Sequence, residues 1–184
     1  MNYRDYQNAR DMAWKLLVDL DIRALPVRPG SICKALGIPI KFYTPVDEND
    51  GMSFFVEQTP IIMVSEKVQL PRQRFTAAHE LGHILLGHVG RYELVNREPD
   101  PKDNPIEQAA NVFASRLLAP ACVLWGCNAR TPEQIAALCN ISYQSARFRA
   151  ERMEVLYQRN KFLTSPLEQQ VYQQFADYIA AHQL

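Results

Sequence analysis

Apolar residues recur at helical spacing at the start of the chain. Between Asp5 and Leu20 they would lie on one side of a helix, at Ala9, Ala13, Leu16, Leu17 and Leu20. A second, short helix is predicted from about Pro29, because proline is favoured in a first helical turn and Gly37 is placed to end it. Residues 38–43 are predicted to follow as a strand.

Two further strands are predicted before residue 70. The runs Met52 to Glu57 and Ile61 to Val64 are mainly apolar, and Gln58-Thr59-Pro60 between them would form the turn of a hairpin. The second run is continuously apolar, so it is expected to be an inner strand. We therefore expect a small antiparallel sheet.

Two longer helices are predicted next, joined by a polar segment. The first begins at Pro71 and runs toward Gly87. Residues 90–104 carry many charges and prolines without apolar periodicity, so we expect a mobile loop beside a cleft. Asn104 as N-cap and Pro105 in the first turn then open a helix that ends before Pro120.

Only helices are predicted after residue 125. The first opens with a capping box, Thr131-Pro132-Glu133-Gln134, and ends where Asn140 can take a left-handed turn. Ser142 then caps a second helix, so residues 131–157 resemble a helix-turn-helix. A last amphipathic helix is predicted from Ser165 onward.

The predicted fold class is α+β. In a first domain, residues 1–125, the small antiparallel sheet would pack on the 71–87 helix, which is followed by the 105–120 helix. Residues 126–184 would form an all-helical region that contains the helix-turn-helix-like segment.

Composition narrows the class of protein. The chain has 184 residues, 47% of them hydrophobic, and its 20 basic and 20 acidic residues cancel, so no overall charge points to nucleic acid or a membrane surface. The N-terminus lacks the apolar core of a signal peptide and no run is long enough to span a membrane, so we expect a cytoplasmic protein. The four cysteines have no metal-binding or redox spacing, which favours reduced, mostly buried thiols.

The sequence His79-Glu80-Leu81-Gly82-His83 carries the candidate chemistry. On a helix, His79 and His83 are about 40° apart, so their imidazoles can converge on one metal ion. Glu80 lies about 100° from His79, which suits a general base acting on water rather than a third ligand. The alternative is a buried helix whose histidines bond to backbone or carboxylate groups.

The third ligand is less clearly marked. The spacing of a metzincin would require Gly at position 86 and His at position 89, which are leucine and valine here. His88 is one residue out of register, and packing or capping is the expected role for it. A carboxylate remains, and among Glu93, Glu98 and Glu107 only Glu107 is on a predicted amphipathic helix. Glu107 could instead close a capping box with Asn104.

Two sequence blocks carry a resemblance to a known family. Residues 74–88, RFTAAHELGHILLGH, and residues 107–120, EQAANVFASRLLAP, resemble the ImmA/IrrE family of zinc metallopeptidases. Ala119 departs from the family, which often has methionine there. The resemblance implies that His79, His83 and Glu107 bind zinc and that Glu80 is the base. Asn111, one turn after Glu107, could hydrogen-bond to a ligand or only to backbone.

Two classes of function follow. The resemblance implies a zinc endopeptidase that cleaves a specific cytosolic protein, with a helix-turn-helix transcriptional repressor of a mobile element or stress response as the usual substrate. The alternative is a non-catalytic module with a structural zinc site, in which residues 130–184 bind DNA or a partner protein. An intact Glu80 favours the enzyme, because a structural site needs no base. The oxyanion could be stabilised by His88, Tyr92, Arg72 or Arg74, and the sequence does not separate them.

The C-terminal region gives a weak indication of DNA binding. Residues 130–161 hold six basic and three acidic side chains, with Arg147, Arg149 and Arg152 on the predicted second helix. Such a small excess is far below the number of phosphate contacts that a DNA reader makes. We expect weak, sequence-independent DNA binding, and the sequence sets no oligomeric state.

Overall fold

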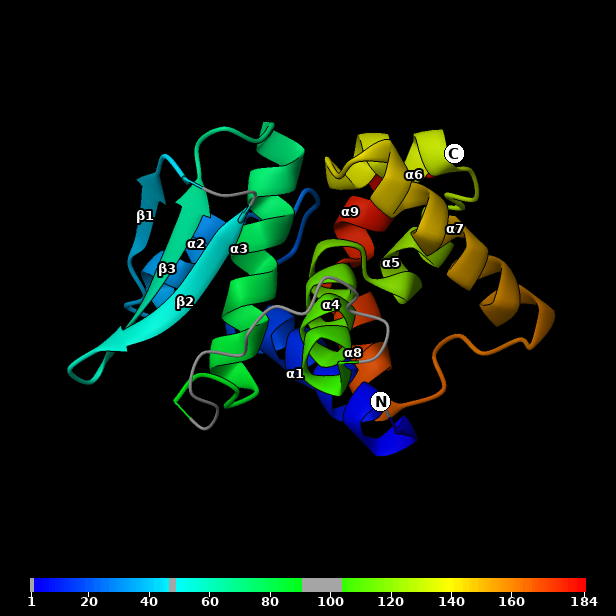
Figure 1. Cartoon of the computed structure of the whole chain (residues 1–184). Coiled ribbons are helices and arrows are strands. Elements are labelled where there is room, and N and C mark those ends of the chain that lie inside the picture. Colours follow the sequence, from blue (N-terminus) through cyan, green and yellow to red (C-terminus); the bar gives the residue numbers. More distant parts are fainter. Residues whose placement is uncertain (1, 47–48, 91–103) are drawn as a thin grey trace. The chain divides into compact units, whose positions relative to one another are not determined.

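A computed structural model describes residues 2–46, 49–90 and 104–184. The elements, labelled in Figure 1, follow in chain order: α1 (Tyr3–Asp19), α2 (Pro29–Ala35), β1 (Ile40–Tyr43), β2 (Gly51–Val56), β3 (Thr59–Ser65), α3 (Leu70–Leu85), α4 (Pro105–Leu118), α5 (Ala121–Gly126), α6 (Pro132–Cys139), α7 (Tyr143–Gln158), α8 (Pro166–Gln174) and α9 (Ala176–Ala181). The predicted α+β class is confirmed. The loop predicted at residues 90–104 lies outside the described residues except for its two ends.

The sheet is mixed, so the antiparallel prediction is wrong for one of its pairs. Its strands have the order β1-β3-β2. β2 and β3 are antiparallel, as predicted, but β1 is parallel to β3, with Ile40 opposite Ile62. The central place of β3 confirms the inner strand inferred from its apolar run. Apolar patterning gives the burial of a strand but not the direction of a partner distant in sequence, so it does not reveal the parallel pairing of β1 with β3.

The hairpin turn is shorter than predicted. Val56 lies opposite Thr59, so only Glu57 and Gln58 connect the strands, and Glu57 takes the left-handed conformation with φ 56°. Pro60 therefore belongs to β3, opposite Phe55, and not to the turn. A two-residue turn fixes the register of β2, which matters because β2 carries a residue of the site.

The chain divides into two compact units, and the first contains the sheet. It comprises residues 1–12 and 28–114. Within it, α3 packs on β2 and β3, as Figure 1 shows, and α2 packs on α3. The buried side chains include Ile62 and Val64 of β3 with Ala78 and Leu81 of α3. At Gly51 the strand comes so close to the helix that an added Cβ would lie 2.3 Å from the methyl group of Thr76.

The second unit, residues 13–27 and 115–184, is helical. In it α5 packs on α8 and α6 packs on α7. Gln174 donates to the carbonyl oxygens of Leu17 and Ile22, both at 2.7 Å, which ties α8 to a segment far away in sequence. The predicted boundary between residues 125 and 126 does not coincide with either break of this unit and stays a prediction.

The caps predicted after residue 130 are present. Thr131 and Gln134 form the capping box of α6, Asn140 takes the left-handed conformation with φ 49°, and the Ser142 side chain caps α7. The helix-turn-helix-like unit, and its use in DNA or protein binding, stay predictions. Among the described residues, the stretch Pro105–Gly126 is long and apolar enough to cross a membrane, but 72% of it is buried inside the protein, as in a core helix.

All four cysteines are buried free thiols. Burial raises the pKa of Cys33 to about 12 and that of Cys127 to about 11, so thiolate is scarce at pH 8. We expect iodoacetamide at pH 8 to leave these thiols unmodified in the folded chain and to label them in denaturant, as read by mass spectrometry. Rapid labelling of the folded chain would contradict the buried state.

Candidate metal centre

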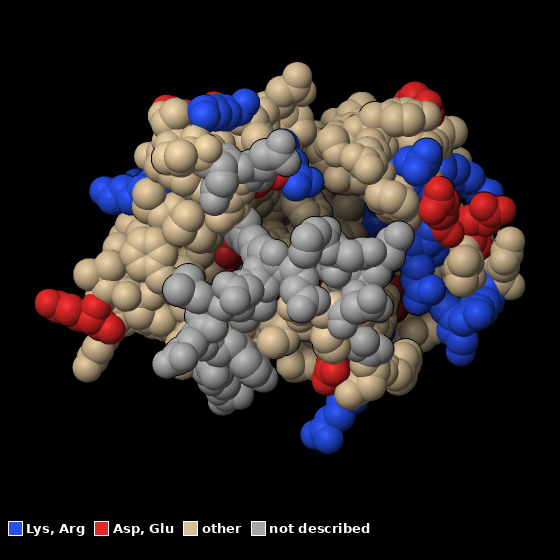
Figure 2. Space-filling view, in the orientation of Figure 1, with Lys and Arg blue, Asp and Glu red and all other residues tan. Residues whose placement is uncertain are grey.

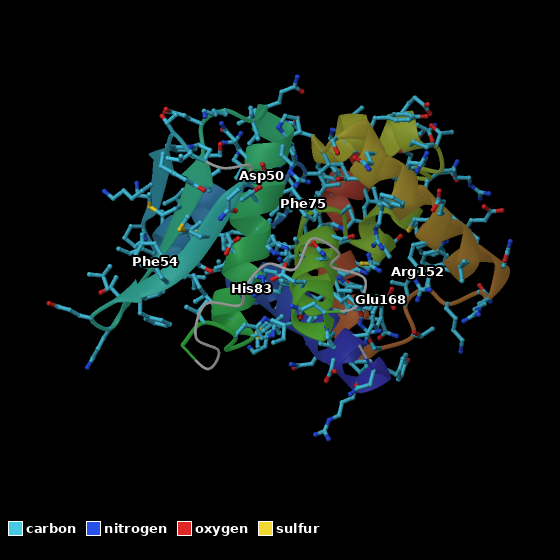
Figure 3. All side chains as sticks on the ribbon, viewed as in Figure 1. Asp50, Phe54, Phe75, His83, Arg152 and Glu168 are labelled. Atoms are coloured by element: carbon cyan, nitrogen blue, oxygen red, sulfur yellow. The ribbon has the colours of Figure 1, made fainter. Side chains whose placement is uncertain are left out.

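Helix α3 carries two histidines one turn apart. Proline in the first turn starts the helix, and at its end Gly87 takes the left-handed conformation, with φ 71°. The His88 N–H then donates to the His83 carbonyl at 2.9 Å, which reverses the chain. His79 and His83 both lie on α3, with ring centroids 4.7 Å apart. Figure 3 labels His83 on this helix.

Glu107 joins these histidines from the first turn of α4. Asn104 caps that helix as predicted, since its side-chain oxygen accepts from the backbone N–H groups of Ile106 at 3.0 Å and Glu107 at 3.4 Å. The Glu107 carboxylate takes no part in this cap and contacts the two histidines. One oxygen lies 3.2 Å from His79 Nε2 and the other lies 3.2 Å from His83 Nε2. The three side chains predicted from sequence are therefore brought together.

The donor atoms of this trio have the spacing of a metal site. They all lie within 4.8 Å of one another, and the two Nε2 atoms are 3.0 Å apart. Ligands at about 2.0–2.1 Å in a tetrahedral site are separated by roughly 3.3 Å, close to the three distances here. Two ring nitrogens and a carboxylate that face one point are electron-rich, and a cation at that point would stabilise all three. The residues present fit a metal ion.

Asn111 contacts the far side of His79. Its amide oxygen lies 3.0 Å from His79 Nδ1, and because that oxygen can only accept, the ring nitrogen donates. The neutral ring then has its lone pair on Nε2, the atom that faces the trio. Of the two roles left open for Asn111, the hydrogen bond to a candidate ligand is the one the structure contains.

His88 contacts the far side of His83, which the sequence did not indicate. Its Nδ1 lies 3.1 Å from His83 Nδ1. A longer helix would have turned His88 away, but α3 ends at Leu85 and the turn at Gly87 brings the ring back. Burial, together with the neighbouring His83, lowers the pKa of His88 to about 4, so this ring is neutral at pH 7.

Glu80 is buried beside the trio on α3. Only 2% of its surface is exposed, and Ser53 of β2 donates to its Oε2 at 2.7 Å. Ser53 has no recognisable motif in the sequence, and only the register of β2 places it there. The close contacts of its oxygens with the His79 and His83 rings hold the pKa of the Glu107 carboxyl well below its usual range, against the opposing effect of burial, so Glu107 is ionised.

The two helices that carry the ligands, α3 and α4, make a close contact at Gly82. A Cβ added at Gly82 would lie 2.9 Å from Cδ1 and 3.2 Å from Cβ of Phe113. We expect Gly82→Ala to lower the thermal stability of the chain, since overpacking costs about 1–3 kcal/mol and exceeds the gain of about 1 kcal/mol in helix propensity. Gly30→Ala on α2 is the control, because its Cβ would meet nothing within 4 Å. Equal melting temperatures for the two variants would mean that α4 moves aside freely.

Other residues singled out in the sequence lie elsewhere or outside the described part. Arg149 is 2% exposed and donates to the Ala119 carbonyl at 2.8 Å, so it faces the interior of its unit and not DNA. Arg72 pairs with Asp50 at 2.5 Å, and Arg74 lines a cavity with Arg28 and Lys34. Tyr92, Glu93 and Glu98 lie outside the described residues.

Comparisons with known proteins identify the family of the chain. Residues 33–151 match the family model Peptidase_M78, the IrrE N-terminal-like domain. The radiation response metalloprotease IrrE of Deinococcus deserti is 32% identical over 123 residues, covering 61% of this chain and 42% of the relative. Its counterpart in Deinococcus radiodurans is 29% identical over 123 residues, covering 61% and 36%.

The chain therefore spans about two fifths of the length of these relatives. The family match covers both helices of the candidate centre, the sheet, and most of α7. The chain therefore belongs to the family of the IrrE N-terminal-like domain, which confirms the resemblance of its sequence to the ImmA/IrrE family.

Proposed function

We propose that the chain is a zinc-dependent endopeptidase that cleaves a specific protein. One observation carries the proposal: His79, His83 and Glu107 direct three ligand atoms at one point, and the helix of the two histidines also bears the buried Glu80. Two imidazoles and one carboxylate, leaving a fourth position open, are typical of catalytic zinc. The metalloprotease relatives support a hydrolytic role.

Each protein group has a defined part in peptide hydrolysis. Bound zinc would supply Lewis acidity, which polarises the peptide carbonyl and lowers the pKa of water. Glu80 takes the proton from the attacking water and later passes it to the leaving amine nitrogen. Ser53 holds one carboxylate oxygen of Glu80 in place through a hydrogen bond of 2.7 Å. Asn111 keeps the His79 ring in the orientation that presents Nε2.

A structural zinc site does not require the hydrogen-bonded pair of Ser53 and Glu80. It needs a closed shell of ligands, and nothing in it requires a buried carboxylate held by a serine next to the first histidine. The presence of Glu80 and Ser53 in one hydrogen bond therefore favours the enzyme over the non-catalytic module.

We infer that the substrate is a protein recognised partly away from the centre, with a helix-turn-helix repressor as the leading candidate from the family resemblance. Helix α7 presents exposed aromatic side chains, Tyr143 and Phe148, which are 57% and 54% exposed, and Arg147 lies over the Phe148 ring at 5.3 Å. Figure 2 shows acidic side chains among the basic ones on the right of the view, so a uniform DNA-binding face is not supported. Aromatic and arginine side chains are enriched where proteins bind proteins.

The experiment is a search for new N-termini. A cell extract is incubated with the zinc-loaded full chain or with its Glu80→Gln variant, and peptides are labelled at their N-termini and identified by mass spectrometry. We expect one or a few cleavage sites that depend on Glu80, in a DNA-binding repressor. Identical profiles for both proteins would contradict a peptidase, and dependence on Glu80 in an unrelated protein would contradict only the substrate class.

A further inference from the structure

His88 lies where it can control the protonation of a candidate ligand. Its Nδ1 is 3.1 Å from His83 Nδ1, and the two rings meet edge to face, with centroids 5.1 Å apart and an interplanar angle of 69°. The same His83 ring presents Nε2 to the Glu107 carboxylate at 3.2 Å. Both nitrogens of His83 are therefore in hydrogen-bond range of a partner.

A neutral His83 ring carries one proton, for which Glu107 and His79 compete at Nε2 and His88 competes at Nδ1. If the proton is on Nε2, the ring donates to Glu107 and has no lone pair for a metal ion. If it is on Nδ1, the ring donates to His88 and its Nε2 lone pair faces the point shared by the ligand atoms. The acceptor on the far side decides which form is stable.

We propose that His88 is a positioning residue, which accepts a hydrogen bond from His83 Nδ1–H and so holds His83 in the tautomer that binds metal. This inference rests on the proposed function of the centre. It assigns to His88 the role that Asn111 has at His79, so that each histidine is fixed from the side away from Glu107. His88 has its own proton on Nε2.

The rival arrangement reverses the hydrogen bond. His88 Nδ1–H would then donate to His83 Nδ1, which places the proton of His83 on Nε2, between the other ligand atoms. A purely packing role is the other rival, since the ring of His88 is half-buried and any ring of similar size would fill the same space.

Two substitutions separate these roles in the full chain. His88→Phe keeps a ring but removes the acceptor, whereas His88→Asn places an amide oxygen at the position of Nδ1. His182→Asn is the matched control, because His182 is exposed and far in sequence from the centre, and its ring contacts the carbonyl oxygen and the ring of Tyr178. Zinc affinity is measured by competition with a chromophoric chelator. We expect His88→Phe to weaken it about 10–100-fold, and His88→Asn to stay within about threefold of the unchanged chain.

A second readout does not depend on zinc. Nitrogen-15 NMR of the metal-free chain at pH 7.5 reports which ring nitrogen carries the proton. We expect His83 to be protonated on Nδ1 in the unchanged chain and to shift to Nε2 in His88→Phe. A proton on His83 Nε2 in the unchanged chain overturns the proposal, and so does equal zinc affinity or equal weakening in the two His88 variants. An unchanged chain that binds no zinc contradicts the proposed function, while the NMR result still decides the role of His88.

Discussion

Replacing Glu80 by glutamine is expected to lower the rate of peptide cleavage by about 10²–10⁴-fold, the usual contribution of a positioned general base. Glutamine has nearly the same shape as glutamate and can still accept from Ser53, but it cannot take up the proton of the attacking water. The measurement is kcat/KM for the protein substrate found by N-terminal labelling, with zinc content and melting temperature recorded for each variant.

Ser53→Ala is a second variant for the same measurement, with a smaller expected effect. It removes the hydrogen bond to Glu80 Oε2 and leaves the carboxylate in place, so we expect a smaller loss of rate, about tenfold or less, with zinc content unchanged. Undiminished cleavage by Glu80→Gln would exclude Glu80 as the base. A loss of zinc in that variant would point to a structural fault and not to missing proton transfer.

Replacing Glu107 by alanine is expected to weaken zinc binding by more than tenfold. Its carboxylate oxygens lie 3.2 Å from both histidines, and with them it makes up the minimum of three protein ligands for such a site. The dissociation constant is measured on the full chain by chelator competition, and the expected result is a chain that folds but does not retain zinc through dialysis.

Asn104→Ala distinguishes ligation from capping. Asn104 caps α4 through the N–H groups of Ile106 and Glu107, so its loss should cost about 1 kcal/mol of stability and leave zinc affinity within about twofold. If Glu107→Ala lowered stability by a similar amount and left zinc affinity unchanged, Glu107 would be a capping neighbour only.

The features that could be predicted from the sequence depend on residues that lie close together in the chain. Caps and turn formers such as Asn104, Ser142 and Gly37 mark helix ends, because their side chains or backbone freedom act within one turn. The spacing of His79 and His83 defines a shared face for the same reason. Glu107 required the family resemblance, since its spacing also suits a capping box.

The features that escaped prediction depend on contacts between distant segments. Ser53 reaches Glu80 across 27 positions of the chain, and the parallel pairing of β1 with β3 has no signature in either strand. The sequence groups Arg149 with the basic residues that gave a weak indication of DNA binding, but its side chain donates to the carbonyl of Ala119, 30 positions away in the chain. The contact of His88 with His83 escaped prediction for another reason. Gly87, in the left-handed conformation, reverses the chain before His88, and helical periodicity cannot be used beyond the end of the helix.

The glycine inside the histidine motif has a consequence for which ion the centre prefers. Because Gly82 lets α4 approach until Phe113 touches the α3 backbone, it keeps the Glu107 oxygens at 3.2 Å from both rings. Ligand atoms this close together suit a small ion. Calcium, in contrast, needs a larger number of ligands, all of them oxygen atoms, at about 2.3–2.6 Å. A side chain at position 82 would push α3 and α4 apart and lengthen the distances from Glu107 to the two histidines. We therefore expect Gly82, which is not itself a ligand, to influence which ion fits the centre, because the absence of a side chain there allows the close approach of Phe113.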